Sequence, residues 1–112
     1  MLKRLENTGA SEVVSGQFVI SNELGLHLRP AGLLVKTANK YASSITVEKD
    51  GMQADAKSII EITSLNAAHN STITIKACGP DARQAIAALA ALITSSFYEP
   101  QTDGKKPQEP PA

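Results

Sequence analysis

The chain has 112 residues, of which 42% are hydrophobic, so its length suits one domain with one buried core and argues against a second domain. Eleven basic side chains balance eleven acidic ones and no block of like charge occurs, which argues against a nucleic-acid-binding protein. The single cysteine, Cys78, excludes an intramolecular disulfide and a cysteine-cluster metal site. We expect its thiol to be buried or half-buried.

The two ends of the chain differ from its centre. Residues 1–12 contain no apolar stretch long enough for a signal peptide, and we expect a flexible N-terminal extension there. The most apolar run, residues 86–93, is far shorter than the about 20 residues that a membrane-spanning helix needs. Residues 99–112 hold four of the six prolines and no large apolar side chain, so we expect a disordered tail. The predicted organisation is one cytoplasmic domain over residues 13–98.

Within this domain the hydrophobic period switches between strand and helix. Val14, Phe18 and Ile20 share one parity, which predicts a strand that ends near residues 21–22. Apolar residues at helical spacing then predict a first helix over about Leu28–Lys40.

A hairpin and a short helix are predicted next. Residues 43–49 alternate, and Asp50–Gly51 supply a tight turn before a weaker second strand. Ser58 stands three residues before Glu61, which is the spacing of a capping box at a helix start. We therefore predict a second helix over about Ser58–Asn66.

The last strand and helix complete the pattern. Residues 71–77 alternate again, and a longer helix is predicted after Gly79–Pro80. One apolar face of that helix would carry Ala82, Ile86, Leu89, Ile93 and Phe97. The order βαββαβα in so short a chain predicts an α+β open-faced sandwich, with a four-stranded antiparallel sheet and three helices on one face.

His27, one of two histidines, stands directly before the first predicted helix. The backbone N–H groups of Leu28 and Arg29 have no intrahelical partner there, and the helix dipole adds partial positive charge. The Arg29 guanidinium can bond phosphate oxygens in a fork. These groups suit an anion on or beside the imidazole, and they favour a neutral ring that can act as a nucleophile. The alternative is that His27 is a surface cap and Arg29 a solvated charge.

No other motif in the sequence completes an enzyme. There is no P-loop, no carboxylate cluster for magnesium, no second histidine placed for zinc and no serine elbow. We expect His69 to be an exposed loop residue. A histidine that can carry phosphate, without machinery to hydrolyse nucleotides, indicates a relay protein that needs neither metal nor other cofactor.

The segments LGLHLRPAG at residues 24–32 and AKSIIEITSL at residues 56–65, in the predicted βαββαβα order, resemble the HPr family. These proteins are the phosphohistidine carriers of the bacterial phosphoenolpyruvate-dependent phosphotransferase system. The resemblance covers about Gln17–Phe97. It implies that His27 is phosphorylated on the ring nitrogen nearer the backbone and that Arg29 neutralises the phosphoryl group. It also implies that enzyme I donates this group and that a histidine of an EIIA-type protein accepts it.

Ser58 matches the regulatory phosphorylation site of the same family. The resemblance therefore implies a serine kinase/phosphorylase as a further partner. A phosphate at the predicted cap of the second helix would meet unpaired backbone donors. A plain capping serine is the alternative.

A docking patch is predicted on the second helix. Ile59 and Ile60 should be partly exposed because the helix buries its other apolar side chains, and adjacent exposed aliphatic residues often mark a docking surface. The resemblance implies that this surface meets enzyme I and EIIA-type proteins. Thr63 and Leu33 would extend it.

Two other function classes stay open beside the transport relay. One is a regulatory HPr-like protein that is controlled by phosphorylation of Ser58 or His27 and binds regulators, since the segment around His27 is as similar to the nitrogen-related branch as to the sugar-transport branch. The other is a stand-alone enzyme with His27 as general acid or base, for which the sequence offers no second catalytic group. We expect a monomer in each case.

Overall fold

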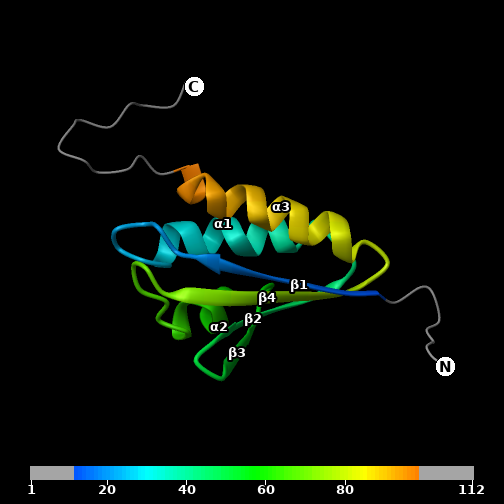
Figure 1. The fold of residues 1–112 in the computed structure, drawn as a ribbon, viewed down its shortest axis with the longest axis horizontal. Coiled ribbons are helices and arrows are strands. Elements are labelled where there is room, and N and C mark those ends of the chain that lie inside the picture. The colour runs from blue at the N-terminus through cyan, green and yellow to red at the C-terminus, as the bar shows by residue number, and fades with distance from the viewer. Residues whose placement is uncertain (1–11, 99–112) are drawn as a thin grey trace.

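A computed structural model describes residues 12–98. The elements in chain order are β1 (Glu12–Val19), α1 (Leu28–Ala38), β2 (Ser44–Lys49), β3 (Met52–Asp55), α2 (Ile59–Ser64), β4 (Thr72–Gly79), α3 (Ala82–Thr94) and the short 3₁₀ helix η2 (Ser96–Tyr98). The strands form one antiparallel sheet in the order β1-β4-β2-β3 (Figure 1). The predicted βαββαβα sandwich is confirmed. The expected extension and tail lie outside the described residues, apart from Glu12, which begins β1.

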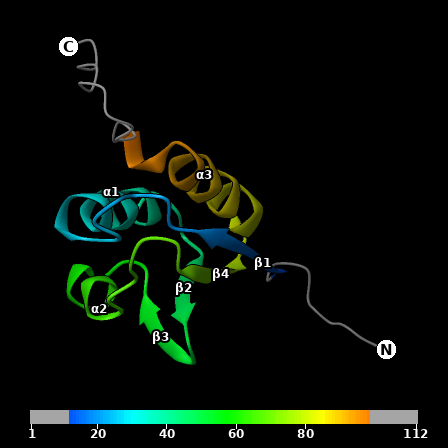
Figure 2. The ribbon, with the colours of Figure 1, turned by 60° about the vertical axis from the view of Figure 1, so that its left-hand side comes forward.

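The alternation along the strands separates a buried face of the sheet from an open one. On β4, the buried residues Ile73, Ile75 and Ala77 alternate with exposed or half-exposed ones. The helices lie together on the buried side (Figure 2). There α3 packs against β1 and β4, while α2 packs against β3 and α1. The longest helix, α3, has 13 residues, so no helix within residues 12–98 is long enough to cross a bilayer.

Cys78 lies on the open face of the sheet. It pairs with Val13 on β1 and Ser44 on β2, and its thiol is exposed. The expected burial of this thiol is wrong, because alternation along β4 turns the residue next to buried Ala77 toward solvent.

The start of α2 differs from the predicted capping box. The Ser58 hydroxyl accepts a hydrogen bond from the Glu61 N–H at 3.3 Å, as predicted. The Glu61 carboxylate, however, accepts from the N–H of Asp55 at 2.8 Å, and the Ser58 N–H donates to the Asp55 carbonyl at 3.0 Å. The helix is also shorter than predicted, and the left-handed backbone of Asn66, with φ 56°, prevents its continuation.

The end of α3 differs from the predicted apolar face. Phe97 is fully buried, as expected of a core residue, but the helix ends at Thr94. Ser96, Phe97 and Tyr98 follow with φ values of 55°, 56° and 63°, all in the left-handed region. Phe97 therefore enters the core from a left-handed turn after the helix. Ile86, on the predicted face, is partly buried against the core.

The loop between α1 and β2 is tied to the start of α3 by Asp81. Its carboxylate accepts hydrogen bonds from the N–H groups of Ala42 and Ser43, both at 2.9 Å, and from the Ser43 hydroxyl. These bonds, the one from the Ser43 hydroxyl first, hold the pKa of Asp81 below its ordinary value. A methyl group on Gly79 would lie 2.6 Å from the Ser43 oxygen, so this junction requires glycine.

Candidate functional site

The loop that carries His27 is fastened to the loop between α2 and β4. The Asn22 carbonyl accepts from the Gly25 N–H at 2.9 Å and closes a tight turn, and the Leu26 N–H donates to the Ala67 carbonyl at 2.8 Å. Gly25 has φ +73°, and a methyl group there would lie 2.5 Å from the Ala67 carbonyl oxygen. The glycine in this motif therefore serves both a left-handed turn and a close backbone approach.

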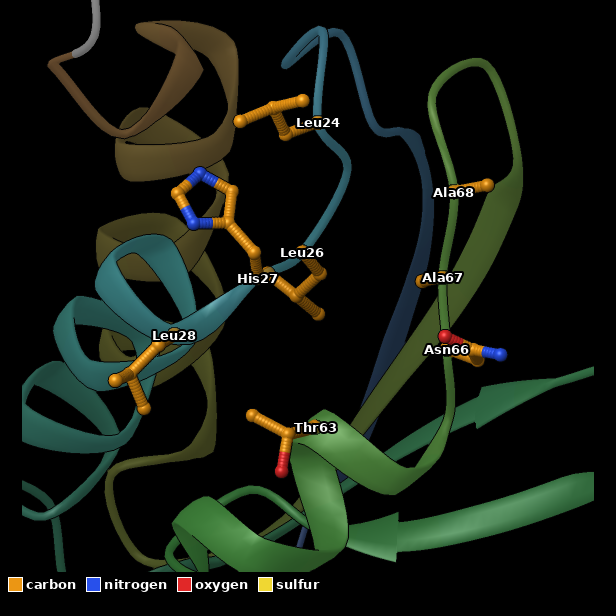
Figure 3. Close-up of a pocket in the computed structure, with 8 residues that line it drawn as sticks. All are labelled: Leu24, Leu26, His27, Leu28, Thr63, Asn66, Ala67 and Ala68. Atoms are coloured by element: carbon orange, nitrogen blue, oxygen red, sulfur yellow. The ribbon is translucent and has the colours of Figure 1, made fainter.

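His27 occupies the N-cap position of α1 through its backbone. Its carbonyl accepts from the Ala31 N–H at 2.9 Å, while its side chain makes no capping hydrogen bond. The imidazole is half-buried. In Figure 3 the ring lies over the first turn of α1, and the ring nitrogen nearer the backbone is on the side of that turn. The His27 side chain therefore does not occupy the first backbone N–H groups of α1, and another acceptor can bind them.

Those donors belong to Leu28 and Arg29, the first two residues of α1. The earliest hydrogen bond of the helix is made by the N–H of Ala31, and Pro30 before it has no N–H. Arg29 is exposed, and within residues 12–98 it forms no ion pair. Two backbone N–H groups thus lie at the start of α1 next to His27, and Arg29 carries its guanidinium on the same first turn. Together they are a donor set suited to phosphate oxygens.

A shallow groove of about 440 Å³ opens next to the imidazole (Figure 3). Its lining comes from the His27 loop, from α2 and from the following loop: Leu24, Leu26, His27, Leu28, Thr63, Asn66, Ala67 and Ala68. The Thr63 hydroxyl donates to the Ile59 carbonyl at 2.9 Å, which turns its methyl group toward the groove. The groove therefore presents both apolar side chains and polar groups beside the imidazole.

The helices α1 and α2 each contribute a residue to the groove lining, and they also carry aliphatic side chains that we call the aliphatic rim: Leu33, Ile59 and Ile60. Ile60 is 74% exposed, while Ile59 and Leu33 are half-buried against the core. Sequence reasoning missed the side chains of Leu24 and Leu28, which are 77% and 70% exposed on either side of His27. Leu24, Leu26 and Leu28 share one parity in the sequence, yet of these three only Leu26 is buried, so the period does not predict the exposure of the other two.

Two other predicted residues are not among those that line the groove. Ser58 begins α2 and is not among the residues that line the groove, whereas Thr63 of the same helix is. His69 is an exposed loop residue, as predicted. Within residues 12–98, no group of three or more histidine, cysteine or acidic side chains could hold a metal ion.

Comparison with known proteins agrees with this geometry. A family model described as the PTS HPr component phosphorylation site matches residues 14–95. The phosphocarrier protein HPr of Cupriavidus necator is 41% identical over 80 residues, which are 71% of this chain and 90% of that protein. The HPr-like protein Crh of Halalkalibacterium halodurans is 42% identical over 81 residues, which are 72% of this chain and 96% of that protein.

Solved structures show the same likeness. A crystal structure of HPr from Thermoanaerobacter tengcongensis matches with a TM-score of 0.75 and 44% identity. The match covers 77% of this chain and 97% of the HPr chain. A crystal structure of HPr from Bacillus anthracis gives a TM-score of 0.69 at 43% identity, with coverage of 72% and 96%. The chain therefore belongs to the HPr family of phosphocarrier proteins of the phosphotransferase system.

Proposed function

We propose that this phosphocarrier accepts a phosphoryl group from enzyme I on His27 and passes it to a histidine of an EIIA-type protein. The observation that carries the proposal is the position of the His27 imidazole over the first turn of α1, whose first two residues, Leu28 and Arg29, have N–H groups without an intrahelical acceptor. The ring is half-exposed at the edge of an open groove, so a second protein can reach it.

The transfer exchanges one N–P bond for another. The lone pair of the His27 ring nitrogen nearer the backbone attacks the phosphorus of the donor phosphohistidine, and the donor nitrogen leaves with the electron pair of the broken bond. The other ring nitrogen of His27 keeps its proton. Charge on the transferred oxygens is stabilised by the Leu28 and Arg29 N–H groups and by the Arg29 guanidinium. The step needs no metal or nucleotide on this chain.

The partners would dock over the aliphatic rim of the groove. Ile60 and the half-buried Ile59 lie on α2, and Leu33 lies on the neighbouring helix α1. Thr63, on the same helix as the two isoleucines, lines the groove together with His27. An apolar rim around a reactive histidine suits the brief contact of one carrier with two partners in turn.

A regulatory function is the second candidate, and the 42% identity to the HPr-like protein Crh favours it. A related crystal structure is described as a catabolite repression protein that forms a domain-swapped dimer. In this reading a serine kinase/phosphorylase modifies Ser58, and the chain acts by binding regulators, as in the nitrogen-related branch. We expect a monomer, whereas an HPr dimer has also been crystallised from Thermoanaerobacter tengcongensis.

The test is incubation of the purified protein with enzyme I, magnesium and labelled phosphoenolpyruvate. We expect a label that is lost in acid and kept in alkali, absent from His27→Ala and retained in the matched variant His69→Ala. Transfer from the labelled protein to an added EIIA-type protein would complete the relay. Absence of label from the wild-type protein would refute the proposal. Label on Ser58 with a serine kinase and ATP would support the regulatory function.

A further inference from the structure

The turn before His27 lies against the C-terminal segment that follows α3, and two buried polar side chains connect them. Asn22 is 3% exposed and Ser96 is 4% exposed, and they are 74 residues apart in the chain. The Asn22 side-chain amide donates to the Ser96 carbonyl at 2.8 Å. The hydroxyls of Ser21 and Ser96 share a second hydrogen bond of 2.6 Å.

The Asn22 backbone also holds the turn in place. Its carbonyl accepts the Gly25 N–H and so forms the turn that leads into His27. One residue therefore shapes the loop with its main chain and fastens that loop with its side chain. Because buried polar groups are costly unless they are paired, the bond to Ser96 strongly favours a single position of the turn.

The acceptor side is held in an uncommon conformation. Ser96, Phe97 and Tyr98 are all left-handed, and non-glycine residues rarely adopt this conformation, least of all in succession. The fully buried Phe97 ring anchors the turn, and η2 contacts both α3 and α1. The left-handed turn aims the Ser96 carbonyl at Asn22. Strained backbone of this kind persists where the surrounding structure determines it.

We propose that Asn22 is a positioning residue for His27, and that its bond to the left-handed Ser96 turn sets the angle at which the imidazole meets the incoming phosphoryl group. The inference rests on the proposed function of His27. In-line transfer between two nitrogens tolerates little misalignment. Hydrogen bonds on two sides of the His27 loop would therefore help to keep the imidazole in line with the phosphoryl group. Leu26 provides one anchor on Ala67, and Asn22 provides the other on Ser96.

The first test variant is Asn22→Asp, which keeps the shape of the side chain but replaces the donor amide with an acceptor. We expect the rate of phosphorylation at saturating enzyme I to fall about tenfold, with little change in KM, because the docking surface is intact while the imidazole is misaligned. The His27 ring signals in the ¹H–¹⁵N spectrum should shift, while those of His69 stay in place as an internal reference.

A matched control separates positioning from general stability. Asn39→Ala removes another asparagine amide bond to a carbonyl, the 3.0 Å bond to Val35, at the exposed end of α1 away from His27. We expect this matched control to leave both the rate and the His27 signals unchanged.

The outcomes distinguish this inference from the proposed function. If wild-type His27 is never labelled, the proposed function fails. If Asn22→Asp is folded and is labelled at the wild-type rate with unchanged His27 signals, the relay stands and the positioning role is refuted. If Asn22→Asp does not fold by circular dichroism, the same comparison is made with Asn22→Ser, whose shorter side chain cannot span the distance to Ser96. A wild-type rate in that variant equally overturns the inference.

Discussion

Gly25 and the carbonyl of Ala67 approach so closely that a methyl group on Gly25 would lie 2.5 Å from the carbonyl oxygen. The contact holds the His27 loop against the loop that follows α2, beside the hydrogen bond from the Leu26 N–H. Gly51 provides a comparison, because it has a similar φ of +83° but nothing within 4 Å of an added methyl group.

The first prediction follows from this pair of glycines. Gly51→Ala should lower the free energy of unfolding by about 1–2 kcal/mol, the usual cost of a left-handed alanine. Gly25→Ala should lower it by at least about 1 kcal/mol more, because the backbone must also shift away from Ala67. It should also slow phosphorylation, whereas Gly51→Ala should not. Urea unfolding and the labelling assay measure the two effects, and equal losses of stability in both variants would contradict the close approach.

The second prediction concerns the guanidinium of Arg29. Arg29→Lys keeps the charge but loses the forked pair of donors, so transfer to His27 should slow by about tenfold, the worth of one charge-assisted hydrogen bond. Stability should be unchanged because the side chain is exposed. Arg83→Lys makes the same chemical change near the start of α3 and should leave the rate as it is. Wild-type transfer by Arg29→Lys would show that a single point charge is sufficient.

The third prediction separates the structural and regulatory roles of Ser58. Ser58→Ala removes the cap bond to the Glu61 N–H and should cost about 1 kcal/mol of stability. Ser58→Asp can keep the cap but adds charge beside the docking rim, so it should weaken binding to enzyme I by roughly 1 kcal/mol, about fivefold in Kd. Ser44→Asp, on the open face of the sheet, is the charge-matched control. Equal Kd values for the two acidic variants would remove the regulatory reading.

The fourth prediction concerns acid stability. Hydrogen bonds from Ser43 and Ala42 lower the pKa of Asp81 in the folded state, so its carboxylate stabilises the fold above the ordinary aspartate value, about pH 4, and this contribution is lost as the pH falls below that value. Asp81→Asn should therefore be less stable than wild type at pH 7, and the difference should shrink toward pH 3. Urea titrations at several pH values measure it. A difference that does not change with pH would contradict the assignment.

The order of the elements and the buried strand positions could be predicted because each depends on local period. On β4, the alternation of Ile73 and Ile75 predicts which face of the strand is buried. The helical spacing after Leu28 does the same for α1, and neither prediction needs a tertiary contact. The position of His27 at the start of α1 follows from the same local pattern. For this reason the sequence alone could place the candidate residue His27 at the start of a helix.

What could not be predicted depends on contacts between distant segments. The left-handed turn at Ser96 is stabilised by Asn22, 74 residues away, and no local propensity favours it. A second difference is local: Glu61 accepts a hydrogen bond from the Asp55 N–H in place of completing the capping box, because the turn before α2 brings that N–H within reach. The exposure of Leu24 follows from the Asn22–Gly25 turn, and the sequence does not indicate it because Leu24 has the same parity as the buried Leu26.

The central claim is that His27 carries the phosphoryl group on the ring nitrogen nearer the backbone, beside the first N–H groups of α1. The most direct measurement is a long-range ¹H–¹⁵N spectrum of the protein phosphorylated by enzyme I and kept at alkaline pH. We predict that this nitrogen of His27 changes its shift on phosphorylation, together with the amides of Leu28 and Arg29, while the His69 ring is unaffected. A phosphoryl group on the other ring nitrogen of His27, on His69 or on Ser58 would contradict the account.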